Sequence, residues 1–155
     1  MHTIYTTGSE EETYEFGRAI ASLLSPGDSV LLKGDLGIGK SVLARGIARG
    51  LGVTQPMPSP SFTMMIPYMG KIPVYHYDLY RLNGIDEFYE AGLDENIGSD
   101  GVSLIEWPQT VDLDVEPALL VSITMGRSTN ERRFLIEGKG LPDYTGSMSR
   151  WREKK

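Results

Sequence analysis

The chain has 155 residues, which is the size of one ordinary domain and leaves no room for a second. It contains no cysteine, which excludes a disulfide scaffold, a thiolate-ligated metal site and a thiol nucleophile. With 15 basic and 21 acidic residues its net charge is −6, which argues against broad sequence-independent binding of nucleic acid. The sequence shows neither a long apolar run nor a signal-peptide pattern, so we expect a cytoplasmic protein that does not enter a membrane.

The first third of the chain predicts a strand, a helix and a second strand. A short strand over residues 3–6 leads to Ser9 and Glu12, which have the spacing of a capping box at a helix start. That helix carries apolar side chains at helical spacing and ends before Pro26-Gly27. The continuous apolar run Val30–Leu32 is typical of a strand buried on both faces of a parallel sheet.

The remaining elements alternate in type. A glycine-rich turn is followed by a helix with Leu43, Ile47 and Leu51 on one side, ending at Gly52. The elements expected after it are a hairpin of residues 62–66 and 74–79, a helix over 84–96, and strands over 102–105, 119–125 and 133–137. This order predicts a three-layer α/β fold with a mixed, mostly parallel central sheet and a β-hairpin insertion.

The glycine-rich turn carries a specific motif. Residues 34–41, GDLGIGKS, match G-x-x-x-x-G-K-[ST] between a buried strand and an amphipathic helix. Glycines let the backbone amides approach a phosphate, and the helix N-terminus favours its negative charge. Lys40 would contact the β- and γ-phosphates, and the Ser41 hydroxyl is a hard ligand for Mg²⁺. We therefore expect a P-loop NTPase-like fold that binds the nucleotide through Gly37, Ile38, Gly39, Lys40, Ser41 and Val42.

Two acidic side chains are candidates to complete this site. The sequence has no Asn/Thr-Lys-x-Asp motif for guanine, so ATP is favoured over GTP. Asp78 and Glu106 each end a predicted strand at the edge where α/β sheets bind ligands. One would ligate Mg²⁺ and the other would orient water, and the sequence leaves this division of roles open. His76 shares a face with Asp78 and is either a packing residue or a functional one, and Trp107 is either a core residue or a contact of the nucleotide.

The loop of residues 58–63, between the P-loop helix and the hairpin, is rich in hydroxyl groups. It is either a connector stiffened by prolines or a switch that senses the γ-phosphate through Ser61 or Thr63. At the other end of the chain, residues 150–155 hold four basic residues and one acidic residue. Such a tail is either a solvated terminus or a docking arm for RNA or an acidic partner. We divide the chain into a P-loop ATPase domain, 1–140, and a C-terminal extension with a basic end, 141–155.

Four segments together resemble the TsaE (YjeE) family, the small bacterial P-loop ATPases of tRNA threonylcarbamoyladenosine synthesis. They are residues 34–41, residues 59–61, the H-x-D-x-Y-R pattern of residues 76–81 and the E-W-P pattern of residues 106–108. They occur in the order and at the separations found in the family, and the resemblance covers roughly residues 1–140. The last two patterns are far more specific than the P-loop alone.

The resemblance implies a weak ATPase with ATP and Mg²⁺ as cofactors. It implies binding to the TsaB–TsaD pair and support for modification of the adenosine beside the anticodon, with TsaD performing the transfer and tRNA contacted indirectly. Its metal ligands would be Ser41 and Glu106, with Asp78 as a further acid and candidate ligand. The catalytic set would be Lys40, Asp78 and Glu106.

The resemblance further implies a switch hydroxyl at Ser61 and nucleotide contacts around Glu10 and near Arg133. Members often carry Thr at positions 41 and 61, and Ser keeps the hydroxyl at both positions. Two other functions stay open. One is a nucleotide-sensing assembly module that does not depend on hydrolysis. The other is a small-molecule kinase, for which Arg127 and Arg132-Arg133 make a poor lid because they lie between strands.

Overall fold

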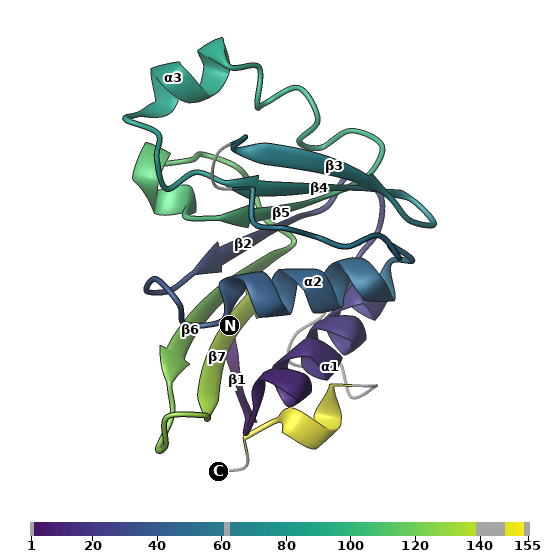
Figure 1. The fold of residues 1–155 in the computed structure, drawn as a ribbon, viewed down its shortest axis with the longest axis vertical. Helices are drawn as coiled ribbons and strands as arrows, with labels where there is room; N and C mark the ends of the chain where they lie inside the picture. Colours follow the sequence, from purple (N-terminus) through teal and green to yellow (C-terminus); the bar gives the residue numbers. More distant parts are fainter. Residues whose placement is uncertain (1, 61–62, 139–147, 154–155) are drawn as a thin grey trace.

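The computed structural model describes residues 2–60, 63–138 and 148–153 of the chain. Its described residues form one seven-stranded sheet in the order β1-β7-β6-β2-β5-β4-β3 (Figure 1). The strands are β1 (His2–Thr7), β2 (Ser29–Lys33), β3 (Met65–Met69), β4 (Pro73–Asp78), β5 (Val102–Glu106), β6 (Leu119–Met125) and β7 (Arg132–Gly138). The α-helices are α1 (Glu10–Ile20), α2 (Lys40–Gly50) and α3 (Ile85–Glu90), and the 3₁₀ helices are η1 (Ala21–Leu23), η2 (Pro108–Val111) and η3 (Ser149–Trp151).

The centre of the sheet is parallel and its margins are antiparallel. Strand β2 pairs in parallel with β5 and β6, and β5 pairs in parallel with β4. At one margin β3 pairs antiparallel with β4, and at the other β7 pairs antiparallel with both β6 and β1. The predicted mixed, mostly parallel sheet is therefore confirmed. The predicted hairpin is β3–β4, and it is continuous with the main sheet because β4 lies beside β5.

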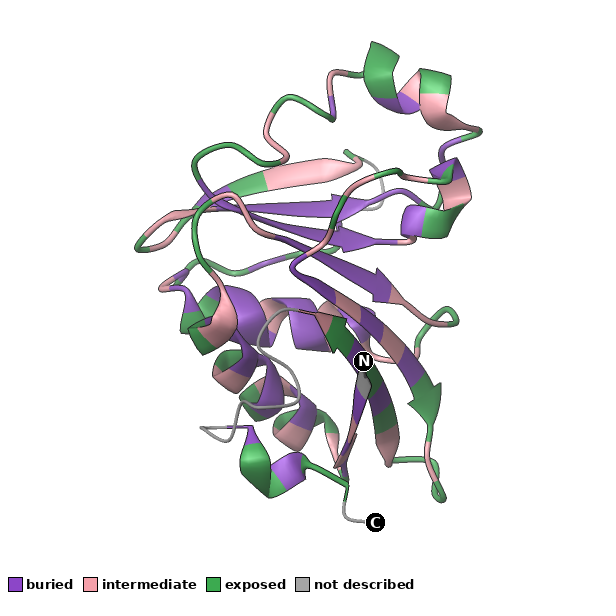
Figure 2. Ribbon diagram, turned by 180° about the vertical axis from the view of Figure 1, so that it is seen from behind, coloured by how far each residue is buried: buried purple, intermediate pink, exposed green. Residues whose placement is uncertain are grey.

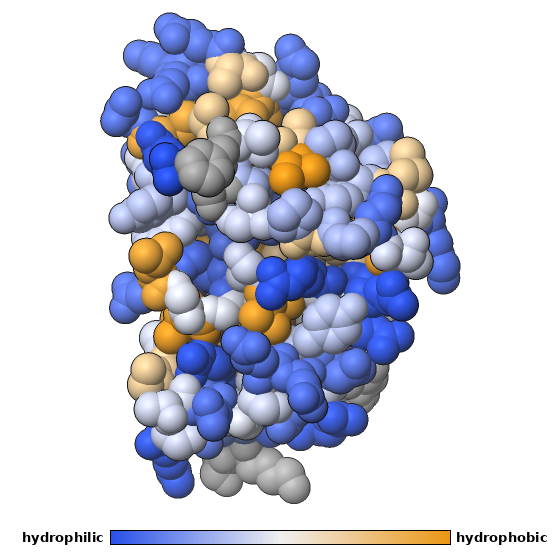
Figure 3. Space-filling view, viewed as in Figure 1, coloured by the Kyte–Doolittle hydropathy of each residue, from blue (hydrophilic) through white to orange (hydrophobic). Residues whose placement is uncertain are grey.

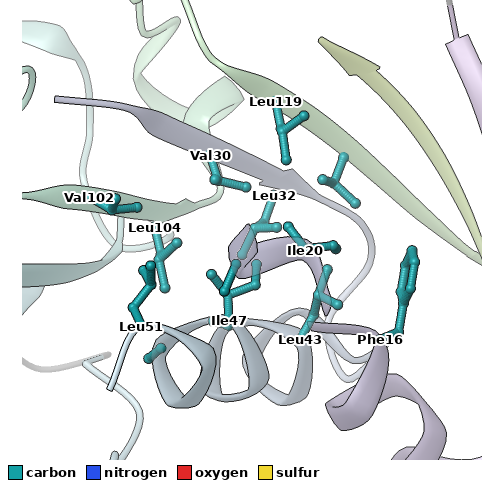
Figure 4. Close-up of a cluster of buried hydrophobic side chains, with 14 of the residues drawn as sticks. Phe16, Ile20, Val30, Leu32, Leu43, Ile47, Leu51, Val102, Leu104 and Leu119 are labelled. Atoms are coloured by element: carbon teal, nitrogen blue, oxygen red, sulfur yellow. The ribbon is translucent and has the colours of Figure 1, made fainter. Parts of the chain in front are cut away.

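Both faces of the sheet are covered at its central strands β2, β4 and β5, as expected for three layers, whereas the face of β7 that points away from the helices is exposed. Helices α1 and α2 pack on one face, where Phe16, Ile20 and Ile47 meet Val30 and Leu32 (Figure 4). The other face carries a second buried cluster, made mainly by residues from β2, β4 and β5 together with α3 and η2. Buried residues accordingly run along the central strands (Figure 2). Because side chains alternate along a strand, the two clusters take alternate residues of the same strands.

Local signals explain where the helices begin and end. The Ser9 Oγ accepts a hydrogen bond from the Glu12 N–H at 3.1 Å, which confirms the predicted cap of α1. The predicted helix over 84–96 is shorter, since α3 ends at Glu90 and turns follow it. Gly92 adopts φ +72°, and the turn brings Leu93 back into the core beside Phe88.

The described part of the C-terminal tail packs against the domain, beside α1 (Figure 1). Trp151 is buried, and its ring lies 5.4 Å from that of Phe16. The Glu153 N–H donates to the Ile4 carbonyl at 2.8 Å, and the Glu153 carboxylate pairs with Arg133. Residues 148–153 therefore extend the core and cover the outer edge of β1, whereas the side chains of Arg150 and Arg152 are exposed.

The outer surface is largely hydrophilic. Figure 3 shows hydrophilic side chains over much of one face, with apolar ones in separate patches. Leu36, at the tip of the P-loop, is the most exposed large apolar side chain of the described residues, at 76%. Within those residues no helix is both long and apolar enough to cross a membrane.

Candidate nucleotide site

The P-loop connects the end of β2 to the start of α2 and is shaped by its glycines. Gly37 and Gly39 adopt φ values of +77° and +117°, in the region that glycine favours. A β-carbon built on either residue would meet nothing within 4 Å. Backbone conformation, and not crowding, therefore requires glycine at these two positions. The space beside the loop stays open to a ligand.

The Lys40 side chain folds back onto the P-loop. Its Nζ donates hydrogen bonds to the carbonyls of Gly34 and Asp35, the latter at 2.8 Å, and lies 4.1 Å from the centroid of the Trp107 ring. Burial lowers the pKa of Lys40 below its ordinary value, and the negative charges of Glu106, Asp78 and Asp35 oppose this effect. The ammonium group therefore lies among carbonyls and carboxylates at the start of α2.

A buried hydrogen-bonded chain runs from Ser41 through Glu106 to His76. The Ser41 Oγ donates to both carboxylate oxygens of Glu106, at 3.3 and 3.2 Å. On its other side the His76 Nε2–H donates to Glu106 Oε2 at 2.6 Å. His76 and Glu106 are almost fully buried, so this pair holds the carboxylate in one orientation.

Asp78 stands beside Glu106, since the two residues are register partners at the ends of β4 and β5. Alternation along β4 places Val74, His76 and Asp78 on the face covered by α2, because Val74 belongs to the cluster beneath that helix. The Asp78 Oδ1 accepts the Tyr80 N–H at 3.0 Å. Both predicted acids, Asp78 and Glu106, therefore lie near the start of α2.

Most of the predicted site residues line a single pocket of about 270 Å³. The pocket is lined by Glu10, Leu36, Gly37, Gly39, Lys40, Ser41, Val42, Ser59, Asp78, Glu106 and Trp107. Trp107 follows the end of β5 and adopts φ +61°, and its ring packs against that of Tyr80 in a tilted arrangement, with the ring centroids 4.7 Å apart. The structure therefore brings together the P-loop, both acids, Glu10 and Trp107, which come from four separate segments of the sequence.

Two predicted residues, Ile38 and Arg133, are absent from this lining set. The side chain of Ile38 packs against the core beneath α2 and not into the pocket. Ser61 lies outside the described residues, and the nearby Ser59 lines the pocket. Arg133 is exposed and pairs with Glu153 at 3.0 Å, on the far side of β7 from the helices.

Arg132 contacts the P-loop, which the sequence interpretation did not predict. Its Nε donates to the Ile38 carbonyl at 2.7 Å. The alternation of β7 explains the difference from Arg133, because Phe134 and Ile136 belong to the cluster beneath α1 and α2. Arg132 shares their face and Arg133 does not. The apolar residues that follow the arginine pair were the signal that could have identified Arg132.

The donor atoms at the mouth of the P-loop fit a magnesium nucleotide. Among the described residues no group of three or more His, Asp or Glu side chains could hold a metal ion alone. The hydroxyl of Ser41 and the carboxylates of Glu106 and Asp78 are hard oxygen donors, the type that Mg²⁺ prefers. Mg²⁺ ordinarily takes one or two protein carboxylates and completes its shell with phosphate oxygens and water. This set therefore suits an ion that arrives with a phosphate ligand.

Comparisons with known proteins agree with this architecture. Residues 7–134 match the family model described as threonylcarbamoyl adenosine biosynthesis protein TsaE. The chain is 37% identical to the tRNA threonylcarbamoyladenosine biosynthesis protein TsaE of Bacillus subtilis, over 88% of this chain and 85% of that protein. It is 35% identical to the protein of the same name from Treponema pallidum, over 76% and 86% of the two chains.

A solved structure is also similar. The crystal structure of Bacillus subtilis YdiB superimposes with a TM-score of 0.75 and 33% identity, covering 90% of this chain and 87% of that chain. Sequence and fold thus match the same family over most of the chain, including the P-loop, β4 and β5. The chain belongs to the TsaE family of threonylcarbamoyl adenosine biosynthesis proteins.

Proposed function

We propose that this protein binds Mg·ATP and hydrolyses it slowly, as a partner-activated switch on a TsaB–TsaD complex that threonylcarbamoylates the tRNA adenosine beside the anticodon. The single observation that carries this proposal is the contact between Ser41 and Glu106 at the mouth of a P-loop. It joins the first helical hydroxyl after the phosphate loop to a strand-end carboxylate. Membership of the TsaE family supplies the pathway, and the named relatives are tRNA threonylcarbamoyladenosine biosynthesis proteins.

The P-loop would bind the phosphates through its backbone amides and Lys40. The Lys40 ammonium now binds the carbonyls of Gly34 and Asp35, so it must exchange these partners for phosphate oxygens when nucleotide enters. Trp107 lies against the ammonium and can hold it near the loop during the exchange. Charged donors beside the phosphates contribute to the electrostatic stabilisation on which phosphoryl transfer depends.

Ser41 and one of the two carboxylates, Glu106 or Asp78, would hold the magnesium ion that accompanies the nucleotide. When bound, the ion would neutralise the negative charge that develops on the phosphates. One of the two carboxylates remains to orient the attacking water. His76 keeps Glu106 directed towards Ser41 and away from competing rotamers.

The lining of the pocket also supports slow turnover by the isolated protein. Its residues, within the described part of the chain, include no arginine that could stabilise the transferring phosphoryl group. An arginine supplied by a partner accelerates P-loop hydrolases by about 10³–10⁵-fold. We therefore expect hydrolysis to accelerate when the protein joins its partners.

Reconstitution with TsaB and TsaD tests this function. ATP turnover and modified tRNA formed per enzyme are measured for the wild type, Asp78→Ala and Glu106→Ala, with Glu90→Ala on the exposed side of α3 as the control. We expect turnover to rise on complex formation, and multiple rounds of modification to require both acids and a hydrolysable nucleotide. If the protein alone hydrolyses ATP rapidly and TsaB–TsaD does not change the rate, the proposed switch is refuted. Many rounds of modification after hydrolysis is lost would identify a nucleotide-sensing assembly module instead.

A further inference from the structure

Arg132 connects the P-loop to the turn between β6 and β7. Its Nε donates to the Ile38 carbonyl at 2.7 Å, and its Nη1 donates to the carbonyls of Thr129 and Glu131 at 2.6 and 3.0 Å. All three acceptors are main-chain carbonyls, and the side chain is partly buried. The guanidinium is a rigid planar donor, so it fixes the acceptors relative to one another.

The contact with Ile38 determines how one peptide of the loop is oriented. The peptide between Ile38 and Gly39 is planar and trans, so its C=O and N–H groups point in opposite directions. Because Arg132 binds the carbonyl, the Gly39 N–H points to the other side of that peptide. Gly39 has φ +117° and a β-carbon position with nothing within 4 Å, so neither its dihedral preference nor packing would hold this peptide by itself.

We propose that Arg132 is a positioning residue of the nucleotide site, which holds the Ile38–Gly39 peptide so that its amide is ready to bind phosphate. The inference rests on the proposed binding of a nucleotide by the P-loop. Arg132 acts through the backbone of the loop and touches no phosphate. Its role therefore depends on the hydrogen-bond donor at Nε and not on the positive charge.

Two substitutions separate the donor from the charge. In Arg132→Gln the amide nitrogen is attached to Cδ, as Nε is in arginine, so the donor is kept and the charge is lost. In Arg132→Lys a methylene replaces Nε and the ammonium lies one atom further out, so the charge is kept and the donor is displaced. Arg132→Met removes both features at similar length. Arg18→Gln and Arg18→Lys, at an exposed position of α1, serve as matched controls.

The experiment measures ADP affinity by calorimetry and, without nucleotide, the carbonyl ¹³C chemical shift of Ile38, which reports a hydrogen bond at that carbonyl. We expect Arg132→Gln to bind ADP within about threefold of the wild type and to retain the shift. Arg132→Lys and Arg132→Met should bind about tenfold more weakly, since a hydrogen bond from a charged donor has about this effect, and both should lose the shift. The control variants should match the wild type in both measurements.

Other outcomes would overturn the proposal. If Arg132→Lys keeps the affinity for ADP and Arg132→Gln loses it, the positive charge acts on the phosphates directly. If all variants bind ADP equally well, or if Arg132→Gln and Arg132→Lys lose the same affinity for ADP, the Nε donor has no special role. If the wild type itself binds no ADP, the proposed function fails, and the Ile38 shift still decides whether Arg132 holds the loop.

Discussion

Replacing His76 by leucine leaves the Glu106 carboxylate buried without the imidazole that now binds it. The two side chains are 1% and 4% exposed, and their hydrogen bond is 2.6 Å long. Leaving a buried acceptor without its hydrogen-bond donor costs about 1–3 kcal/mol, and more when the acceptor is charged. The His76 ring also buries an Nδ1 atom with no hydrogen-bond partner among the described residues, and its removal offsets part of the loss. We therefore expect a loss of about 3 kcal/mol.

Urea and thermal denaturation of a double-mutant cycle measure this coupling. For a chain of this length, about 3 kcal/mol corresponds to a melting temperature lowered by roughly 6–12 °C. Glu106→Leu should also destabilise, whereas the double variant with leucine at both positions should lose less than the sum of the single losses, by at least about 1 kcal/mol. A His76→Leu loss below about 1 kcal/mol, or strictly additive losses, would refute the reasoning.

Three further predictions concern stability and the loop. Trp151→Ala should lower the free energy of unfolding by about 3–4 kcal/mol, because the ring is buried against Phe16, and a loss below about 1 kcal/mol in urea denaturation would show that the tail is not part of the core. Burial raises the pKa of Tyr77 to about 12, above its unfolded value near 10, so its contribution to stability is complete below pH 10 and is lost as the pH rises to about 12. The free energy of unfolding of Tyr77→Phe should therefore fall less than that of the wild type between pH 10 and 12. Curves of unfolding free energy against pH that run parallel for the two proteins would contradict this. Gly39→Ala should weaken ATP binding through backbone strain, whereas Gly84→Ala, at an extended φ with open space, should not, and equal affinities would exclude the role of the positive φ.

Much of the fold follows from local patterns in the sequence. The run Val30–Leu32 predicts a doubly buried strand because both of its faces meet apolar layers, and β2 lies in the parallel centre of the sheet. The Ser9 cap and the positive φ of Gly52 match their predicted roles at the ends of helices. The helix over 84–96 was predicted too long because apolar spacing alone does not register the cost of Gly92 within a helix.

The proximity of the site residues was predictable where it depends on strand ends. Asp78 and Glu106 end neighbouring parallel strands, so they meet at the edge of the sheet beside the P-loop. The distinction between Arg132 and Arg133 depends instead on which face of β7 is buried. A one-residue difference exchanges the two faces, and only the packing of Phe134 and Ile136 resolves it.

The contacts of the C-terminal tail were the least predictable from local sequence patterns. The composition of residues 150–155 indicated a positively charged tail. The docking of residues 148–153 depends instead on one aromatic contact and on the free edge of β1. Trp151 belongs to the tail, whereas its partner Phe16 and strand β1 lie near the other end of the sequence. Long-range pairings of this kind arise from the tertiary fold, which local spacing does not describe.

The central claim is that Lys40 and Ser41 bind a magnesium nucleotide at the P-loop. Titration of ATP with and without Mg²⁺ into the wild type, Lys40→Ala and Ser41→Ala tests it most directly, with Lys71→Ala in the exposed β3–β4 turn as the control. We expect Lys40→Ala to weaken binding by about ten- to a hundredfold, Ser41→Ala to reduce the effect of Mg²⁺, and Lys71→Ala to match the wild type. ATP affinity that is absent in the wild type, or unchanged in Lys40→Ala, would contradict the account.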